Sequence, residues 1–333
     1  MKKGPIARIP IQMERVDGPA AKEIWESISI AIDDIYNKVC LFVCLFLYYF
    51  PNLVLIFFHR QNVSHYKFEV LHRSAYKLVV HRHGDLLYNE TCATIMKHLR
   101  IFLGEMMEVP QESLLGLITE RYSDHCMCTT RIKEILLYLE RNYILQHKRL
   151  PIYDMGLALF RDTIVGNGII RSRFGAELLR LVSQEREGLL IERDTLKSVL
   201  TMLLELSPGG QNVYEDVFER PFLDESRNYF RRSIERSIAD STAIACLQKI
   251  HRILNSESRN FAHYLPRATE NKLMVIADTE LIERNAGVLA TMERSGVDHM
   301  IRDEKFDDLK MMYDIFNRVP VTLEHIRTCL GKF

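Results

Sequence analysis

Residues 132–143 read IKEILLYLERNY, and the spacing of their apolar side chains decides the class of fold. These side chains recur every three or four positions and share one helical face: Ile132, Ile135, Leu136, Leu139 and Tyr143. A strand would instead alternate apolar and polar residues, and the sequence shows no convincing alternating run bounded by Asn-Gly or Asp-Gly. The stretch therefore predicts an amphipathic α-helix.

The same spacing extends through the rest of the chain. Four other segments carry an apolar helical face: Ile24, Ile28, Ala31 and Ile35; Phe174, Leu178, Leu181 and Val182; Leu196, Val199, Leu200 and Leu203; and Phe306, Leu309, Tyr313 and Phe316. Breaks are predicted at residues 109–110, 149–151, 166–168, 207–210 and 295–296, where Pro and Gly fall. We expect an all-α protein, an elongated, α-solenoid-like stack of helical layers with no sheet.

Composition limits the classes of function. The 333 residues include 44 Lys and Arg against 44 Asp and Glu, so no net charge is available to attract nucleic acid or an anionic membrane. A hydrophobic content of 47% is too high for a disordered chain. The seven scattered cysteines fit a reducing compartment better than a disulfide framework. A packed helical protein of the cell interior is expected.

One uncharged run, Val39–Phe58, reads VCLFVCLFLYYFPNLVLIFF and is long enough to cross a bilayer. It could be a transmembrane helix, a buried core helix or translated intron within an insertion at residues 38–61. We favour the intron, because Leu, Phe, Val, Tyr, Cys and Ile share thymine-rich codons. A full-length transcript that retains the segment would count against this interpretation.

Several short patterns resemble chemical sites but lack the necessary spacing. His125-Cys126-Met127-Cys128 has no second ligand pair downstream, and residues 81–83, His-Arg-His, would point to different faces of a helix. Gly209-Gly210 lacks the Lys and Ser or Thr of a phosphate loop. The acidic pairs Asp33-Asp34 and Asp307-Asp308 are expected on solvated faces or at helix ends. No metal, cofactor or catalytic residue is predicted, and the chain is interpreted as a binding scaffold.

Three segments resemble signatures of the cullin family. Residues 213–223, VYEDVFERPFL, match a Tyr-Glu-x-x-Phe element followed by Pro-Phe-Leu. Residues 292–296, MERSG, followed by His299-Met300, resemble the Met-Glu-x-Ser-Gly element. Residues 309–320, LKMMYDIFNRVP, resemble Met-Tyr-x-Leu-Phe-x-Arg-Val-Pro, with Ile in place of Leu. Each segment mixes aromatic and polar residues at fixed offsets, which makes the combined resemblance specific.

Two further segments indicate the type of cullin. Residues 68–76, FEVLHRSAY, resemble the Phe-Glu-Glu-Leu-Tyr-Arg-Asn-Ala-Tyr helix of the third type, which binds BTB-domain substrate adaptors. Residues 132–141 are similar to its partner helix, Ile-Arg-Asp-Ile-Leu-Met-Tyr-Met-Asp-Arg. The resemblance covers residues 1–37 and 62–333, and the apolar insertion lies where the family has a short polar loop.

The resemblance implies a first cullin repeat at residues 1–150, a second at 151–250 and a partial third at 251–333. It implies a non-catalytic scaffold of a cullin-RING ubiquitin ligase, acting in ubiquitin-dependent protein degradation in the cytoplasm and nucleus. BTB-type adaptors are the expected partners, with no nucleic acid and no membrane. The chain stops at Phe333, so the C-terminal domain that recruits a RING-box protein in the family is expected to be missing.

Positions that match the family's adaptor-binding helices are Phe68, Glu69, His72, Tyr76, Tyr138 and Arg141. An N-terminal strip, Ile6, Ile9, Ile11 and Met13, is a candidate extension that could fill an apolar groove. Two positions depart from the pattern, because Val70 replaces a Glu and His72 replaces a Tyr. Loss of an interfacial Tyr can reduce binding by about 2 kcal/mol or more, which would either narrow the set of adaptors or abolish binding.

Two other hypotheses remain open from the sequence. The chain could be a membrane-anchored helical interaction protein that uses Val39–Phe58 as its anchor. It could also be a nonfunctional or dominant-negative fragment from a degraded gene copy. Alkaline carbonate extraction tests the first hypothesis, and a search of the downstream reading frame for the missing domain tests the second.

Overall fold

The computed structural model describes residues 16–49, 68–207 and 212–331, and for residues 39–49 it describes the backbone alone. All regular structure in these ranges is helical, with no strand, which confirms the predicted all-α class. The contacts divide the chain into two compact units. Unit 1 comprises residues 1–110 and 120–170, and unit 2 comprises residues 111–119 and 171–333.

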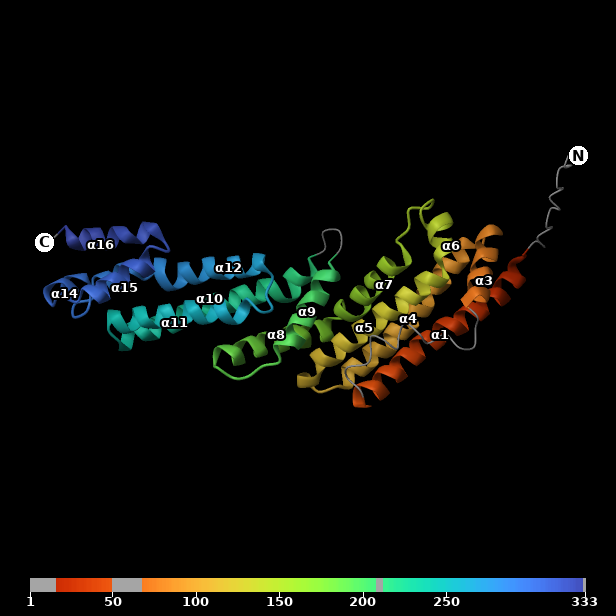
Figure 1. Ribbon diagram of the computed structural model, residues 1–333, viewed down its shortest axis with the longest axis horizontal. Helices are drawn as coiled ribbons and strands as arrows, with labels where there is room; N and C mark the ends of the chain where they lie inside the picture. The colour runs from red at the N-terminus through yellow and green to blue at the C-terminus, as the bar shows by residue number, and fades with distance from the viewer. Residues whose placement is uncertain (1–15, 50–67, 208–211, 332–333) are drawn as a thin grey trace, which may run out of the picture. The chain divides into compact units, whose positions relative to one another are not determined.

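Unit 1 contains the helices that carry the candidate binding residues (Figure 1). Its elements are α1 (Gly18–Tyr49), α3 (Phe68–Val80), α4 (Gly84–Glu108), most of α5 (Leu114–Ile135), α6 (Leu137–Leu139), the π-helical turn η2 (Glu140–Ile144), α7 (Ile152–Phe160) and the π-helical turn η3 (Arg161–Val165). α3 packs against α1, α4 and α6, and α4 packs against α7. The apolar face predicted for residues 132–143 is buried at every position, so it forms part of the core.

The regular structure described in unit 2 is also helical. It contains η1 (Gln111–Ser113), α8 (Gly168–Arg186), α9 (Arg193–Glu205), the π-helical turn η5 (Glu215–Glu219), α10 (Arg220–Asp240), α11 (Ala243–Phe261), α12 (Arg267–Ala277), the π-helical turn η6 (Asp278–Glu283), α13 (Ala286–Ala290), α14 (Val297–Arg302), α15 (Phe306–Phe316), η7 (Pro320–Thr322) and α16 (Leu323–Leu330). α10 lies beside both α11 and α12, as Figure 1 also shows. The buried side chains of these helices form the core of the unit.

The helices end where the sequence predicts breaks. α4 ends before Val109, whose extended backbone (φ −71°, ψ 145°) is the conformation favoured before a proline. The side-chain Oδ1 of Asn167 accepts hydrogen bonds from the N–H groups of Ile169 at 3.1 Å and Ile170 at 3.2 Å. It thereby satisfies backbone donors that the start of α8 would leave unpaired. The predicted breaks at 149–151 and 295–296 precede α7 and α14.

The apolar face predicted for residues 306–316 is wrong in part. Phe306 is 62% exposed and Tyr313 is 49% exposed, whereas the buried residues of α15 are Met312, Ile315 and Phe316. The helix itself is present, but its buried face is rotated from the predicted one. The neighbouring α11, α14 and α16 determine which face is covered, and the spacing of apolar residues alone does not report their positions.

The first part of the apolar run is helical in this chain, where the family has a short polar loop. α1 continues through residues 39–49, and residues 50–58 lie outside the described part of the chain. Among the helices that the structure describes, none is both long and apolar enough to cross a membrane.

The segment at 213–223 has a structural role in unit 2. The hydroxyl of Tyr214 lies 2.9 Å from the hydroxyl of Thr269 on α12, which also donates to the carboxylate of Glu219 at 2.7 Å. The rings of Phe218 and Phe222 are fully buried and stack with centroids 5.1 Å apart. These contacts join η5 and α10 to α12, which explains why the element combines aromatic and polar residues.

The segment at 292–296 is fixed by close backbone packing. The hydroxyl of Ser295 accepts a hydrogen bond from the N–H of Ala243 at 2.9 Å, at the start of α11. A Cβ atom at Gly296 would lie only 2.5 Å from the carbonyl oxygen of Ala290. The backbone could not tolerate a larger residue there without moving, so the glycine follows from the packing.

Candidate protein-binding surface

The helix α3 presents one face to the core and another to solvent. Leu71, Ala75 and Leu78 are buried at positions i, i+4 and i+7, which anchors the helix against its neighbours. Phe68, His72 and Tyr76 are also spaced by four residues, so they form a second row along the helix. Phe68 is exposed, and His72 and Tyr76 are half-buried, which leaves this row accessible to a partner.

Tyr76 and Tyr138 bring the two predicted binding helices together. Their ring centroids lie 4.6 Å apart with an interplanar angle of 63°, an edge-to-face arrangement that aromatic side chains prefer. Tyr138 lies on α6, which packs directly against α3. Both side chains are half-buried, so each is held by packing while part of it stays accessible. We call Phe68, His72, Tyr76 and Tyr138 the aromatic row.

Phe68 and His72 form the other end of the aromatic row. Their ring centroids are 6.3 Å apart, and the Phe68 side chain remains 47% exposed. Val70, two positions along the same helix and therefore on a different side of it, is 54% exposed, which places an apolar group where the family motif has a carboxylate. An exposed Phe and Val contribute little to the core, so their apolar surface is available to a partner.

The charged candidates lie at the surface as well. Glu69 accepts a hydrogen bond from Arg73 at 3.0 Å, and the side chains are 80% and 69% exposed. Such a pair contributes only a few tenths of a kcal/mol to a helix in water. Arg141 is exposed on η2, one turn after Tyr138. These charges therefore contribute little to folding and remain accessible for recognition.

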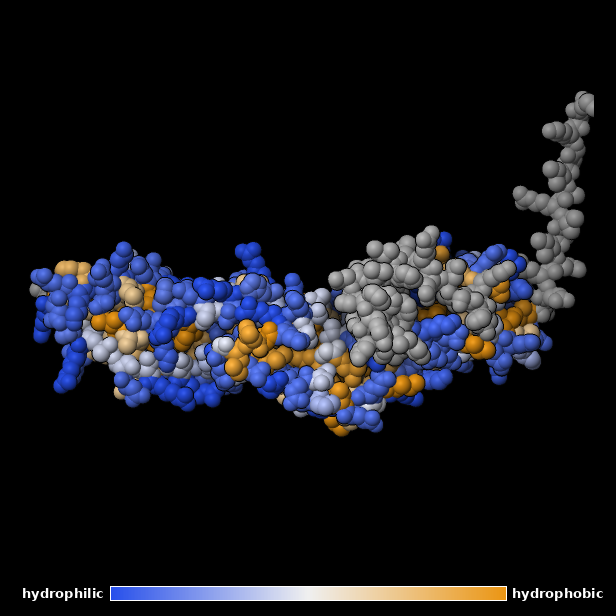
Figure 2. Space-filling view, turned by 60° about the horizontal axis from the view of Figure 1, so that its bottom comes forward, coloured by the Kyte–Doolittle hydropathy of each residue, from blue (hydrophilic) through white to orange (hydrophobic). Residues whose placement is uncertain are grey.

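The aromatic row stands out by its arrangement and not by exposure alone. The face drawn in Figure 2 is mostly hydrophilic, and its apolar patches are separated by polar residues. Single exposed apolar residues occur in several other described helices, including Ile30, Ile101 and Leu204. Scattered residues of this kind are usual for a folded protein. A pair of tyrosines in edge-to-face contact between two helices is a more distinctive surface feature than a single exposed apolar residue.

His125, the first residue of the His125-Cys126-Met127-Cys128 pattern, makes structural contacts in the core. His125 is fully buried, and its ring nitrogens lie 3.0 Å from the hydroxyl of Tyr36 and 2.9 Å from the carbonyl oxygen of Gly156. Burial lowers the pKa of His125 to about 4, so the ring is neutral near pH 7. Because both ring nitrogens are engaged in hydrogen bonds, neither is available to bind a metal ion.

Two other patterns differ from their expected settings. Residues 81–83 form the turn between α3 and α4, where Arg82 has a φ of 65°, so they do not lie within a helix as assumed. The carboxylate of Asp33 accepts a hydrogen bond from Lys97 at 3.3 Å and lies 2.7 Å from Nε2 of His98. It therefore joins α1 to α4 and is not a solvated helix face. No group of three potential metal ligands occurs among the described residues.

The N-terminal strip at residues 6–13 and Gly209-Gly210 lie outside the described residues. Sequence reasoning did not identify the cluster of arginines around Glu280 in unit 2. The spacing of Arg227 and Arg231 by four residues on α10 was a visible signal. The third arginine and the buried carboxylate come from another element, which that spacing cannot show.

Comparison with known proteins places this helical architecture in a family. The family model for the cullin alpha solenoid domain matches residues 25–333, so the chain belongs to the cullin family. It is similar to Cullin-3 from Dictyostelium discoideum, with 33% identity over 83% of this chain and 36% of that protein. Cullin-3A from Arabidopsis thaliana is 32% identical over 94% of this chain and 39% of its own length.

Cullin-4A from Mus musculus is 30% identical over a shorter share, 76% of this chain and 33% of that protein. The resemblance to the third cullin type is therefore confirmed at the level of sequence similarity. The chain spans about a third of the length of the curated relatives it matches.

Proposed function

We propose that this chain is the adaptor-binding part of a cullin-RING ubiquitin ligase scaffold, and that it binds BTB-type substrate adaptors through the aromatic row. The observation that carries the proposal is the packing of Tyr76 against Tyr138, which places accessible aromatic side chains of α3 and α6 side by side. Tyrosine and arginine anchors dominate the energetics of protein interfaces. Glu69 and Arg141 supply charged groups beside them.

The proposed role is that of a scaffold without catalysis of its own. Its output would be ubiquitin-dependent degradation of adaptor-bound substrates in the cytoplasm and nucleus. Recruitment of a RING-box protein would belong to the C-terminal domain of a full-length cullin. The division into cullin repeats at 1–150, 151–250 and 251–333 remains a prediction that accompanies this proposal.

The two departures from the family motif predict weakened but recoverable binding. Val70 removes a carboxylate and His72 removes a phenol from the surface of α3. Since both positions are at least partly exposed, Val70→Glu and His72→Tyr can be made without disturbing the buried Leu71. Each reversion should strengthen adaptor binding if this face contacts the adaptor.

The test measures the affinity of the full chain for a panel of purified BTB-domain proteins by biolayer interferometry. Tyr76→Ala should weaken binding to any adaptor that binds by about tenfold or more, the range of an interface anchor. His72→Tyr should tighten it. The matched control is Tyr313→Ala, which removes a 49% exposed tyrosine from α15 in unit 2.

A panel in which no BTB protein binds even the double reversion Val70→Glu with His72→Tyr would contradict the proposal. So would equal loss of binding in Tyr76→Ala and Tyr313→Ala, because the two tyrosines lie in different units.

A further inference from the structure

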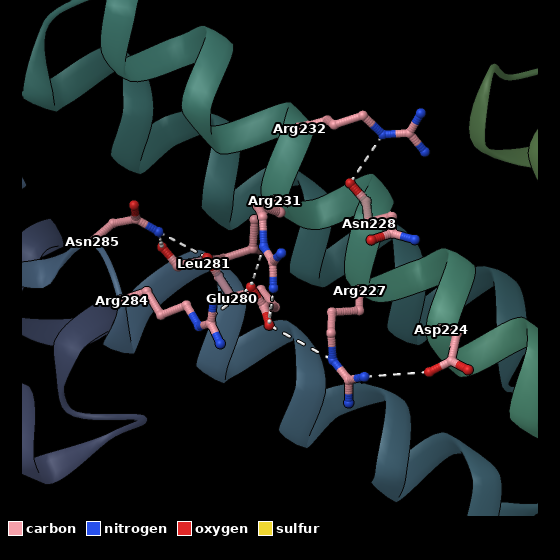
Figure 3. Close-up of polar contacts among 9 residues, drawn as sticks. All are labelled: Asp224, Arg227, Asn228, Arg231, Arg232, Glu280, Leu281, Arg284 and Asn285. Carbon is pink, nitrogen blue, oxygen red and sulfur yellow. Dashed lines mark hydrogen bonds and ion pairs between the residues drawn. The ribbon is translucent and has the colours of Figure 1, made fainter.

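A buried carboxylate in unit 2 lies at the centre of a group of arginines (Figure 3). Glu280 is 2% exposed and lies in η6. The side chain of Asn285 donates to the carbonyl oxygens of Glu280 at 2.8 Å and Leu281 at 3.4 Å, which secures the end of this turn. These two bonds hold the backbone of the turn that carries the carboxylate.

Three arginines direct the same nitrogen, Nε, toward Glu280. The distances to its carboxylate oxygens are 3.2 Å for Arg231, 3.5 Å for Arg284 and 3.7 Å for Arg227. Arg231 makes a second contact through Nη2, at 3.3 Å. Arg227 and Arg231 come from α10, and Arg284 follows η6, so two elements build the group. We call Arg227, Arg231 and Arg284 the arginine triad.

The arginine triad exceeds what the buried carboxylate requires. A single arginine with two hydrogen bonds already gives Glu280 a charge partner, and further guanidinium groups add mutual repulsion. The side chains of Arg227, Arg231 and Arg284 are 45%, 40% and 56% exposed. Nη2 of Arg231 bonds Glu280 and Nη1 of Arg227 bonds Asp224, which leaves Nη1 of Arg231, Nη2 of Arg227 and both Nη groups of Arg284 outside these contacts. The triad is therefore a preorganised set of exposed donors.

Two carboxylates at the surface, those of Asp224 and Glu235, lie near the arginine triad. Asp224 accepts a hydrogen bond from Nη1 of Arg227 at 3.3 Å, but its side chain is 64% exposed, and such pairs are weak in water. Glu235 acts on Arg231 through space. Arg232 points elsewhere, because it pairs with Glu225 at 2.8 Å. Glu280 balances one of the three positive charges of the triad, and the other two face only the exposed carboxylates of Asp224 and Glu235, which a dianion would have to displace.

We propose that the arginine triad binds a phosphorylated serine or threonine side chain of a partner protein. A phosphate monoester carries about −1.5 to −2 charges near pH 7 and three acceptor oxygens, which match the remaining charge and the separate guanidinium donors. A single carboxylate would balance only one of these charges. Arginine clusters are a recurring means of phosphopeptide recognition. The site lies in unit 2 and is independent of the aromatic row.

The test uses a short fluorescein-labelled peptide with one phosphoserine among glycine and alanine residues, titrated with the full chain at low salt. The same peptide with unmodified serine and with glutamate serves for comparison. Fluorescence anisotropy should show a dissociation constant for the phosphopeptide about tenfold or more below both, because a dianion engages more guanidinium donors. Added salt should weaken the binding.

The variant that tests the triad is Arg227→Gln combined with Arg284→Gln. It leaves Arg231 as the two-bond partner of Glu280, so the buried carboxylate stays paired. Phosphopeptide affinity should fall by about tenfold. Arg232→Gln on the same helix is the matched control and should bind as the unaltered chain does. Circular dichroism melting curves check that both variants remain folded.

Several outcomes would overturn the proposal. They are equal affinity for the phosphoserine and glutamate peptides, undetectable phosphopeptide binding at millimolar protein, and unchanged binding in the double variant. Tighter, triad-dependent binding of an oligothymidylate would assign the triad to nucleic acid instead.

Discussion

The aromatic row of unit 1 and the surroundings of Arg186 in unit 2 combine aromatic and charged side chains but differ in how deeply these are buried. The guanidinium of Arg186 lies 4.6 Å from the ring centre of Tyr229 and 5.4 Å from that of Phe261. It also donates to both carboxylate oxygens of Glu257, at 3.0 and 2.9 Å. Both charged side chains are at most 5% exposed. In contrast, the charged pair beside the aromatic row, Glu69 and Arg73, is 80% and 69% exposed.

Burial separates residues that the fold requires from residues that are proposed to bind a partner. Arg186 and Glu257 satisfy each other inside the protein, so removing one leaves a buried charge without its partner. The side chains of the aromatic row have accessible surface that the fold does not use. Changes at Arg186 should therefore affect stability, and changes at the aromatic row should affect binding.

The largest effect is expected for Arg186→Met. The variant leaves Glu257 buried without its cation and removes the contacts with the surrounding rings, so the free energy of unfolding should fall by about 3–5 kcal/mol. Urea denaturation followed by circular dichroism measures it. Arg73→Ala is the exposed counterpart and should change stability by less than about 0.5 kcal/mol. A similar loss of stability in both variants would contradict the distinction between the buried and the exposed arginine.

A second buried charge extends the comparison to pH. Burial raises the pKa of Asp124 to about 6, although Arg121 at 3.0 Å stabilises the charged form. A carboxyl group with a raised pKa stabilises the fold while it is protonated, and this contribution is lost as the pH rises through about 6. The free energy of unfolding of Asp124→Asn, taken relative to that of the unaltered chain at the same pH, should therefore rise by about 3 kcal/mol between pH 4 and pH 7. Denaturation at both pH values checks the sign, and a constant difference would contradict it.

Close packing in unit 1 predicts a smaller loss of stability, which a second substitution should reverse. A Cβ atom at Gly156 of α7 would overlap the methyl group of Thr129 on α5, so Gly156→Ala should cost about 1–3 kcal/mol. Thr129→Ser removes that methyl group and keeps the hydroxyl that bonds the carbonyl oxygen of His125. The double variant should recover most of the stability in a urea melt. If it instead loses the sum of both single effects, the overlap is not the cause.

The sequence predicts the helical class and most helix boundaries because these depend on local spacing, as for residues 132–143, or on local turn residues such as Asn167. It does not predict which face of α15 is buried, since that depends on helices distant in the sequence. For the candidate surface, motif resemblance supplies Tyr76 and Tyr138. Their edge-to-face contact requires α3 and α6 to pack together, and spacing alone cannot establish that packing.

The proposed function requires that the aromatic row contributes more to binding than to folding. Its most direct test measures two quantities on Tyr76→Ala with Tyr138→Ala, namely the affinity for a BTB-domain protein that binds the unaltered chain and the free energy of unfolding. The account predicts that affinity falls by more than about tenfold while stability falls by less than about 2 kcal/mol, since both side chains are only half-buried. Unchanged affinity together with a large loss of stability would contradict it.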